Sequence, residues 1–307
     1  MASSPPLPPV LVSPTQNASN RVDYRLRDAF SCSAGGIGHE LAKVYFAKGV
    51  RVFATARRLE SMNELASLGI ETFALDVNKA ESIEAVKQKI TEINGGRLDI
   101  LFNNAGKAYS LPNSDYDMNQ VSELFNTNVV SIIAMCKAFT PLLIASGHGK
   151  IVNMSSILSF LPLPFAAAYC ATKAALNAYG DSLRVELKPF NIDVITIMAG
   201  IIKSNIFNNA DYKLPENSAY AGMRAYFDNK EHFAVEKQAM PADVFARSVV
   251  ARTLKSSPPK TLWAGAFTTP AWIVSTFLPS WLLAKILGLG AGLPTFAKQL
   301  RADKKQA

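Results

Sequence analysis

A tyrosine and a lysine in the middle of the chain have the residue types and spacing of an acid–base pair. Tyr169 and Lys173 are four residues apart, so on a helix their side chains share one face, one turn apart. A lysine ammonium there is expected to favour the tyrosinate and to lower the phenol pKa from about 10. Such a phenol can exchange a proton with a carbonyl or alcohol oxygen near neutral pH. Because this spacing is also common on ordinary surface helices, the accompanying motifs must decide between the two interpretations.

Ser156 could add a hydroxyl group to the same site. It comes shortly after residues 150–154, a short apolar run that is bounded by Gly149 and predicts a buried strand. A serine at the end of a strand can bind the oxygen that exchanges its proton with Tyr169. Together with Lys173, these residues predict a site at which a hydride could be transferred.

Short apolar segments alternate with helical patterns from residue 34 onward. The strands are apolar throughout, which is typical of a parallel sheet covered on both faces. We therefore predict the α/β class: a doubly wound parallel sheet (Rossmann fold), as a single domain with an apolar C-terminal extension. The strands are expected over residues 50–55, 71–75, 99–102, 150–154, 193–197 and 261–263, and helices over 58–67, 80–93, 120–145 and 168–187.

A glycine-containing segment and an arginine pair could hold a dinucleotide. Gly36, Ile37 and Gly38 open the first helix, where glycines let the backbone approach a pyrophosphate at the positive helix end. After the second strand, where an enzyme that uses NAD usually has an acid, the chain has Ala56 and then two arginines, beginning with Arg57. A planar guanidinium suits a 2′-phosphate, which favours NADPH, although two arginines at a helix start could also be merely exposed.

Three further polar positions could contribute to the site, two after predicted strands and one in a predicted helix. Asp76, after the third strand, could hold the adenine amino group. Asn104 belongs to the segment Asn103-Asn104-Ala105-Gly106, whose small residues would let the chain pass close to the adenine ribose. Asn128 interrupts an apolar run in the long helix, either as a satisfied core amide or as an anchor for a water that feeds protons to Lys173.

Together these motifs resemble the short-chain dehydrogenase/reductase family over residues 32–265. In that family the catalytic serine stands thirteen residues before the tyrosine, which selects Ser156 over Ser155. The resemblance implies that Tyr169 is the acid/base and that Ser156 polarises the carbonyl. It also implies that Lys173 tunes the tyrosine and binds the nicotinamide ribose, and that Asn128 orders a proton relay.

The same resemblance implies further contacts with the cofactor. Tyr169 and Lys173 would both lie against it, and Ile202 and Ser204 would meet the nicotinamide carboxamide. The family has Pro-Gly after the sixth strand, whereas this chain has Ala199-Gly200, which we regard as a minor departure.

The segments Cys32-Ser-Ala-Gly-Gly-Ile-Gly38 and Ala54-Thr-Ala-Arg-Arg58 and the apolar C-terminus are similar to one fungal subgroup of the family. Its members are NADPH-dependent reductases of 1-acyldihydroxyacetone phosphate. The resemblance implies a lipid-like substrate, acyl-dihydroxyacetone phosphate first and a ketosteroid or retinoid as alternatives. It also implies a place on the cytosolic face of the endoplasmic reticulum membrane or of lipid droplets, and by analogy a homodimer.

The first 31 residues do not fit this pattern. The family has a strand and then Thr-Gly before the glycine loop, whereas residues 29–31 are Ala-Phe-Ser. Residues 10–12, Val-Leu-Val, would be that strand if Cys32 followed two residues later. We therefore expect residues 1–31 to be irregular and hypothesise that residues 13–31 are an insertion, from a retained intron or a gene-model error. An insertion that disrupts the cofactor loop would favour an alternative function, a catalytically impaired relative that binds only lipid or a partner.

Residues 266–307 form the apolar extension. Residues 270–289 are nearly long enough to span a bilayer, which takes about 20 residues, but Pro279 and Lys285 interrupt them. Trp272 and Trp281 suit a segment that lies in the membrane interface, and a basic tail follows. The same apolar residues could instead form a dimer contact or a contact with the lid. The segment 205–240 is rich in aromatic residues and is expected to be a substrate lid. Its aromatic side chains would either serve the ordinary packing of a lid or line an apolar tunnel for an acyl or polycyclic substrate.

Composition excludes several other classes. The net charge is +8, and no DNA- or RNA-binding motif accompanies it, so nucleic acid is not expected as a partner. The three cysteines and three histidines have no metal-ligand spacing, so neither a metal site nor a disulfide framework is expected.

Overall fold

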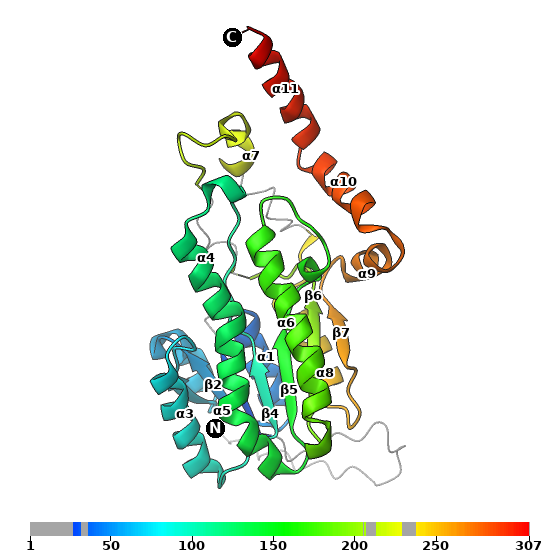
Figure 1. Cartoon of the computed structure of the whole chain (residues 1–307). Helices are drawn as coiled ribbons and strands as arrows, with labels where there is room; N and C mark the ends of the chain where they lie inside the picture. Colours follow the sequence, from blue (N-terminus) through cyan, green and yellow to red (C-terminus); the bar gives the residue numbers. More distant parts are fainter. Residues whose placement is uncertain (1–26, 32–35, 205, 207–212, 229–237, 307) are drawn as a thin grey trace, which may run out of the picture.

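The computed structural model describes residues 27–31, 36–204, 206, 213–228 and 238–306, and its core is a seven-stranded parallel sheet (Figure 1). The strand order is β3-β2-β1-β4-β5-β6-β7. Because the order reverses between β1 and β4, the sheet has a switch point there, as in a doubly wound fold. This confirms the predicted fold class. The strands are β1 Arg27–Ser31, β2 Arg51–Ala56, β3 Glu71–Ala74, β4 Ile100–Asn103, β5 Lys150–Met154, β6 Asp193–Ala199 and β7 Thr261–Ala264.

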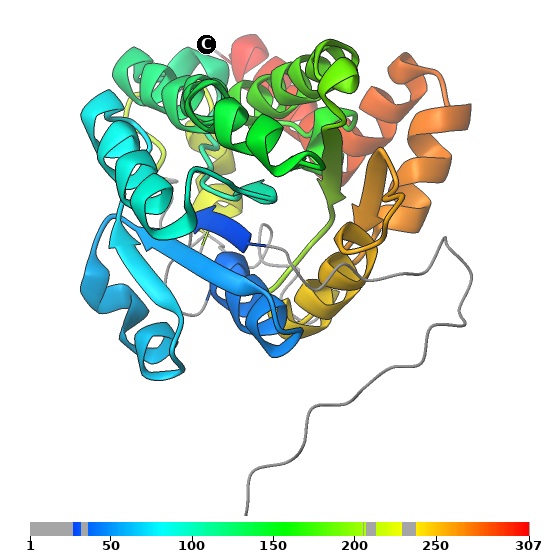
Figure 2. The same ribbon diagram turned by 90° about the horizontal axis from the view of Figure 1, so that it is seen from below.

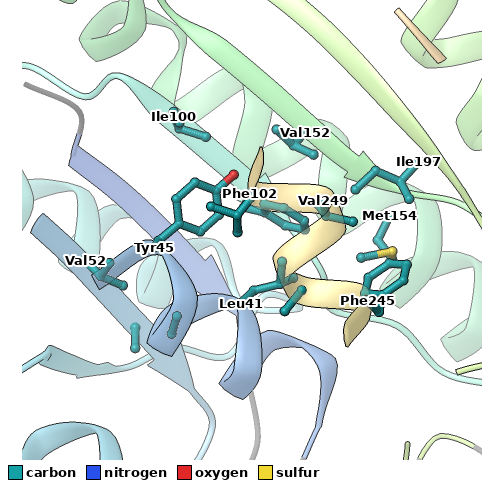
Figure 3. Close-up of a cluster of buried hydrophobic side chains, with 14 of the residues drawn as sticks. Leu41, Tyr45, Val52, Ile100, Phe102, Val152, Met154, Ile197, Phe245 and Val249 are labelled. Carbon is teal, nitrogen blue, oxygen red and sulfur yellow. The ribbon is translucent and has the colours of Figure 1, made fainter. Parts of the chain in front are cut away.

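Helices cover both faces of the sheet (Figure 2). On one face α1 and α8 pack around Leu41, Phe102 and Phe245 (Figure 3), and on the other α3, α5 and α6 pack around Phe139 and Leu176. The helices are α1 Ile37–Ala47, α2 Asn63–Ser67, α3 Ala80–Asn94, α4 Met118–Phe125, α5 Ser131–Ser146, α6 Ala167–Glu186, α7 Arg224–Asp228, α8 Ala242–Thr253, α9 Thr268–Phe277, α10 Ser280–Gly290 and α11 Leu293–Gln306.

The long helix expected over residues 120–145 is continuous from Met118 to Ser146 and contains one π-helical turn, Asn126–Val130. By length and hydropathy it could cross a membrane. Its second half, α5, packs against α3, β4 and β5, so core packing accounts for much of its apolar character.

The first strand differs from the sequence expectation. The structure places Arg27–Ser31 as β1, paired in parallel with β2 on one side and β4 on the other. Residues 27–31 are therefore not irregular, although they lack an apolar pattern, because backbone hydrogen bonds to two neighbours do not depend on side-chain type. Residues 10–12, offered as the first strand, and residues 13–26 lie outside the described residues, so the insertion remains a hypothesis.

Gly180 sets how closely α6 approaches the sheet. A Cβ at this position would lie 2.8 Å from Thr196 Oγ1 on β6. We expect Gly180→Ala to lower the free energy of unfolding by about 1–3 kcal/mol, because overpacking shifts the helix that carries Tyr169 and Lys173. Gly290→Ala is the matched control, since no atom lies within 4 Å of its added Cβ. Denaturant unfolding checks the pair; equal stabilities for the two variants would contradict this view of the packing.

Candidate active site

Two neighbouring elements bring the predicted serine, tyrosine and lysine together. Tyr169 and Lys173 lie in the first two turns of α6, and the Lys173 Nζ is 5.7 Å from the centroid of the Tyr169 ring. Ser156 follows β5 and hydrogen-bonds with Tyr169. The Ser156 hydroxyl also accepts the backbone N–H of Leu158 at 3.1 Å, which fixes its position at the start of a short 3-10 turn. All three side chains are buried.

The two adjacent serines point to different partners. The Ser155 hydroxyl lies 2.6 Å from Asn177 Oδ1 and 3.3 Å from the Lys173 carbonyl oxygen, so it is engaged with the body of α6. Ser156, by contrast, reaches Tyr169. The geometry therefore agrees with the choice of Ser156 over Ser155.

Burial dominates the electrostatics of the pair. It raises the pKa of Tyr169 to about 12, against a smaller lowering by the hydrogen bond with Ser156. It lowers the pKa of Lys173 to about 8. The sequence argument expected Lys173 to lower the tyrosine pKa, whereas the direction here is the opposite, because loss of hydration on burial has the largest influence on the phenol. At neutral pH the phenol is therefore protonated and can donate to an oxygen.

Lys173 and Asn128 are fixed by backbone groups. The Lys173 Nζ donates to the Met154 carbonyl at 2.9 Å. The Asn128 side chain, which is fully buried, accepts from the Lys107 N–H at 2.8 Å and donates to the Lys107 carbonyl at 3.0 Å. It also donates to the Thr172 hydroxyl at 3.0 Å. Asn128 thus ties the loop after β4 to α6, one residue before Lys173.

The loop after β4 passes directly beside these groups. A Cβ added to Gly106 would lie 3.5 Å from Asn128 Oδ1 and 3.7 Å from Lys173 Nζ. A Cβ here would be in ordinary contact with both groups, so glycine keeps the volume of a side chain free next to the lysine. Such a cradle fits the ribose of a dinucleotide at the switch point of the sheet.

The other predicted cofactor residues lie at the carboxyl ends of the strands. Gly36 caps α1, with Ile37 and Gly38 in its first turn, and Arg57 is exposed directly after β2. Asp76 follows β3, and its Oδ1 accepts the Asn78 N–H at 3.1 Å. These positions border one edge of the sheet, as a dinucleotide requires.

The two asparagines after β4 differ in environment. Asn103 is buried and donates from Nδ2 to Asn153 Oδ1 at 2.9 Å, so it joins β4 to β5. Asn104 is only partly buried and begins the loop that reaches Gly106. Asn104 is therefore the better placed of the two to face a cofactor.

Ile202 and Ser204 follow β6 at the same edge. Ile202 is buried and forms a bridge with Met240, whereas Ser204 is partly exposed. The preceding Gly200 is required by packing, because a Cβ there would lie 2.0 Å from the Ala266 carbonyl oxygen. The backbone at Ala266 therefore passes so close to position 200 that glycine is required there, next to Ala199, where the family has proline.

Sequence reasoning missed one residue of the site, Thr172. Its hydroxyl accepts from Asn128 and donates to the Tyr169 carbonyl at 2.7 Å, so it links the two predicted residues. The sequence feature that could have identified Thr172 is its position directly before Lys173, on the side of α6 that faces the long helix.

Comparison with known proteins agrees with this geometry. A family model for short chain dehydrogenase matches residues 32–214. The chain is 38% identical over 261 residues to the short-chain dehydrogenase RED1 of Pyricularia oryzae, covering 83% of this chain and 91% of that protein. It is 34% identical over 280 residues to the NADPH-dependent 1-acyldihydroxyacetone phosphate reductase of Saccharomyces cerevisiae, covering 89% and 93%.

A solved structure shares the fold. The short-chain dehydrogenase from Streptomyces avermitilis superposes with a TM-score of 0.71 at 26% identity, covering 91% of this chain and 99% of the other. Fold, site geometry and relatives therefore lead to one assignment: the chain belongs to the short-chain dehydrogenase/reductase family of oxidoreductases.

Proposed function

We propose that this protein is an NADPH-dependent reductase of a carbonyl group in a lipid-like substrate, with acyl-dihydroxyacetone phosphate as the first candidate. The observation that carries the proposal is the convergence of Ser156, Tyr169 and Lys173 beside Gly106. The S. cerevisiae relative, named as an acyldihydroxyacetone phosphate reductase, supports the substrate class. The place of action that we propose is the cytosolic face of the endoplasmic reticulum membrane or of lipid droplets.

The side chains of this site can perform the proton half of a reduction. When bound, NADPH supplies the hydride. The Ser156 hydroxyl binds the carbonyl oxygen and polarises it, and the Tyr169 hydroxyl donates its proton to that oxygen as the alcohol forms. The Lys173 ammonium then stabilises the tyrosinate that remains, because an opposite charge within about 4–6 Å favours the ionised form.

Arg57 is the residue that we propose for cofactor choice. A guanidinium can form charge-assisted hydrogen bonds with a 2′-phosphate, and each such bond contributes about 1.5–3 kcal/mol. We expect Arg57→Ala to raise the KM for NADPH by about tenfold or more and to leave the KM for NADH unchanged. Arg97→Ala is the matched control, because Arg97 is exposed just before β4, at the opposite edge of the sheet. Equal losses with both cofactors would count against this role.

The substrate is tested by NADPH oxidation with three classes of carbonyl compound: acyl-dihydroxyacetone phosphates, ketosteroids and retinal. We expect the highest kcat/KM for the acyl-dihydroxyacetone phosphates. Preference for a steroid or retinal would change the proposed substrate but not the proposed reaction. Failure with every class, together with binding of lipid, would support the alternative of a catalytically impaired lipid-binding relative.

A further inference from the structure

The C-terminal helices present an apolar surface that the rest of the described chain does not cover. We define the apolar ridge as the large exposed side chains of α9 and α10. In Figure 1 these helices stand at one side of the fold, beyond β7. The ridge residues and their exposed fractions are Trp272 (46%), Ile273 (44%), Phe277 (70%), Trp281 (68%), Ile286 (48%) and Leu289 (58%).

The charges around the ridge favour one occupant. Residues 266–307 contain five basic residues and one acidic residue, Asp303. Lys285, Lys298 and Arg301 are all exposed. Exposed tryptophans beside basic residues are typical of a segment that lies in the interface of an anionic bilayer. A protein partner would have to be both apolar and acidic to match the same surface.

Beyond the ridge the chain contacts residues 213–228, the described part of the expected lid, which we call the lid segment or lid. Helices α10 and α11 are bent by 68° at the break between them. After this turn, Ala291, Leu293 and Phe296 pack against lid residues that include Met223 and Phe227. Phe296 therefore belongs to the lid cluster, although it lies in the extension.

Phe296 is closely fitted to the lid. Its ring stacks on that of Tyr220, with centroids 5.6 Å apart and planes inclined by 26°. A Cβ at Gly222 would lie only 3.0 Å from the Phe296 ring, so a side chain there would press on the ring. Leu300, one turn further along α11, is 42% exposed and outside the cluster.

The same cluster reaches the catalytic helix through Phe165. Its ring lies 5.5 Å from that of Tyr220 and 4.9 Å from that of Phe227. The Phe165 carbonyl accepts the Ser110 hydroxyl at 3.1 Å, and four residues later the chain places Tyr169 on α6. Phe165 also has φ of 66°, a left-handed conformation that a bulky residue keeps only when its surroundings fix it.

Resting on the proposed function, we propose that the apolar ridge docks on an anionic bilayer and that Phe296 couples this docking to the lid, so that the substrate reaches Tyr169 from the lipid. Helix α10 contacts α11, and α11 packs through Phe296 on the lid segment and on Phe165, four residues before Tyr169 in the chain. Docking restricts the motion of α9 and α10. Because Phe296 stacks on Tyr220, the motion of the lid is then restricted as well. Phe296 is therefore a positioning residue for lipid substrates.

Docking is tested without turnover, by flotation of the full chain with phosphatidylcholine vesicles that contain or lack phosphatidylserine. We expect the wild type to float with the anionic vesicles and Trp272→Ala/Trp281→Ala to bind about tenfold more weakly or worse, since burial of each indole is lost. Wild-type protein that stays unbound, or a double variant that floats equally well, would overturn the docking surface.

Coupling is tested by hydrogen exchange in residues 218–227 and by kinetics. With anionic vesicles we expect slower exchange in the wild type and in Leu300→Ala, but not in Phe296→Ala. Phe296→Ala should also raise the KM for a long-chain carbonyl in vesicles while leaving kcat/KM for a small soluble ketone unchanged. Identical exchange and KM values in Phe296→Ala and Leu300→Ala would overturn the coupling. Absence of turnover with every carbonyl, with flotation and exchange as expected, would reject the proposed reductase and leave the docking intact.

Discussion

Replacing Tyr169 by phenylalanine is expected to lower kcat for carbonyl reduction by about 10²–10⁴-fold, the usual contribution of a positioned general acid. The hydroxyl is the proton donor in the proposed reaction, and burial keeps it protonated at neutral pH by raising its pKa to about 12. The ring and its packing against Leu124 and Ala168 remain in the variant. NADPH binding, measured by fluorescence titration, should therefore change far less than kcat.

A matched control separates chemistry from packing. Tyr179 lies on the same helix, ten residues further along, and its hydroxyl hydrogen-bonds with Cys136 instead of Ser156. We expect Tyr179→Phe to retain nearly full kcat. A Tyr169→Phe protein that is as active as Tyr179→Phe would remove Tyr169 from the reaction.

Lys173→Met is expected to produce the second large effect. The ammonium should stabilise the tyrosinate that forms at Tyr169. An opposite charge within about 4–6 Å shifts a pKa by about 1–3 units, so removal of the ammonium should lower the reduction rate by about 10–10³-fold. Burial lowers the pKa of Lys173 to about 8, so the ammonium is largely present at pH 7 and is lost as the pH rises. The wild-type reduction rate should therefore fall as the pH rises through about 8, and the variant should lack this fall.

The same lysine also links stability to pH. Its pKa is about 8 in the folded chain, against an ordinary value of 10.5. Between these values the unfolded chain binds more protons, so the free energy of unfolding should rise with pH across this window. In Lys173→Met, the free energy of unfolding, measured by denaturant titration at pH 8 and pH 10, should lack this part of the rise. A stability that falls between the two pH values only in the wild type would contradict the burial of the lysine.

The sheet and the proximity of Ser156, Tyr169 and Lys173 could be predicted from the sequence. Apolar runs bounded by glycine mark buried strands, Tyr169 and Lys173 are one helical turn apart, and the resemblance to the family supplies the spacing of the serine. The choice of Ser156 over Ser155, which the family resemblance implied, agrees with the structure, because Ser156 hydrogen-bonds with Tyr169 and Ser155 with Asn177.

The features that could not be predicted depend on contacts between distant segments. β1 has no apolar pattern, and its strand character comes from pairing with β2 and β4. The pKa direction of Tyr169 depends on burial, which spacing alone does not reveal. Phe296 lies 127 residues after Tyr169, and only the turn between α10 and α11 brings it to the lid.

The most direct test of the central claim follows deuterium from NADPH that carries deuterium at both hydrogen positions of C4 of the nicotinamide. The account predicts that the wild-type protein transfers the deuterium to the former carbonyl carbon of an acyl-dihydroxyacetone phosphate, and that Tyr169→Phe binds both molecules with almost no transfer. An alcohol product without deuterium, or full transfer by Tyr169→Phe, would contradict the account.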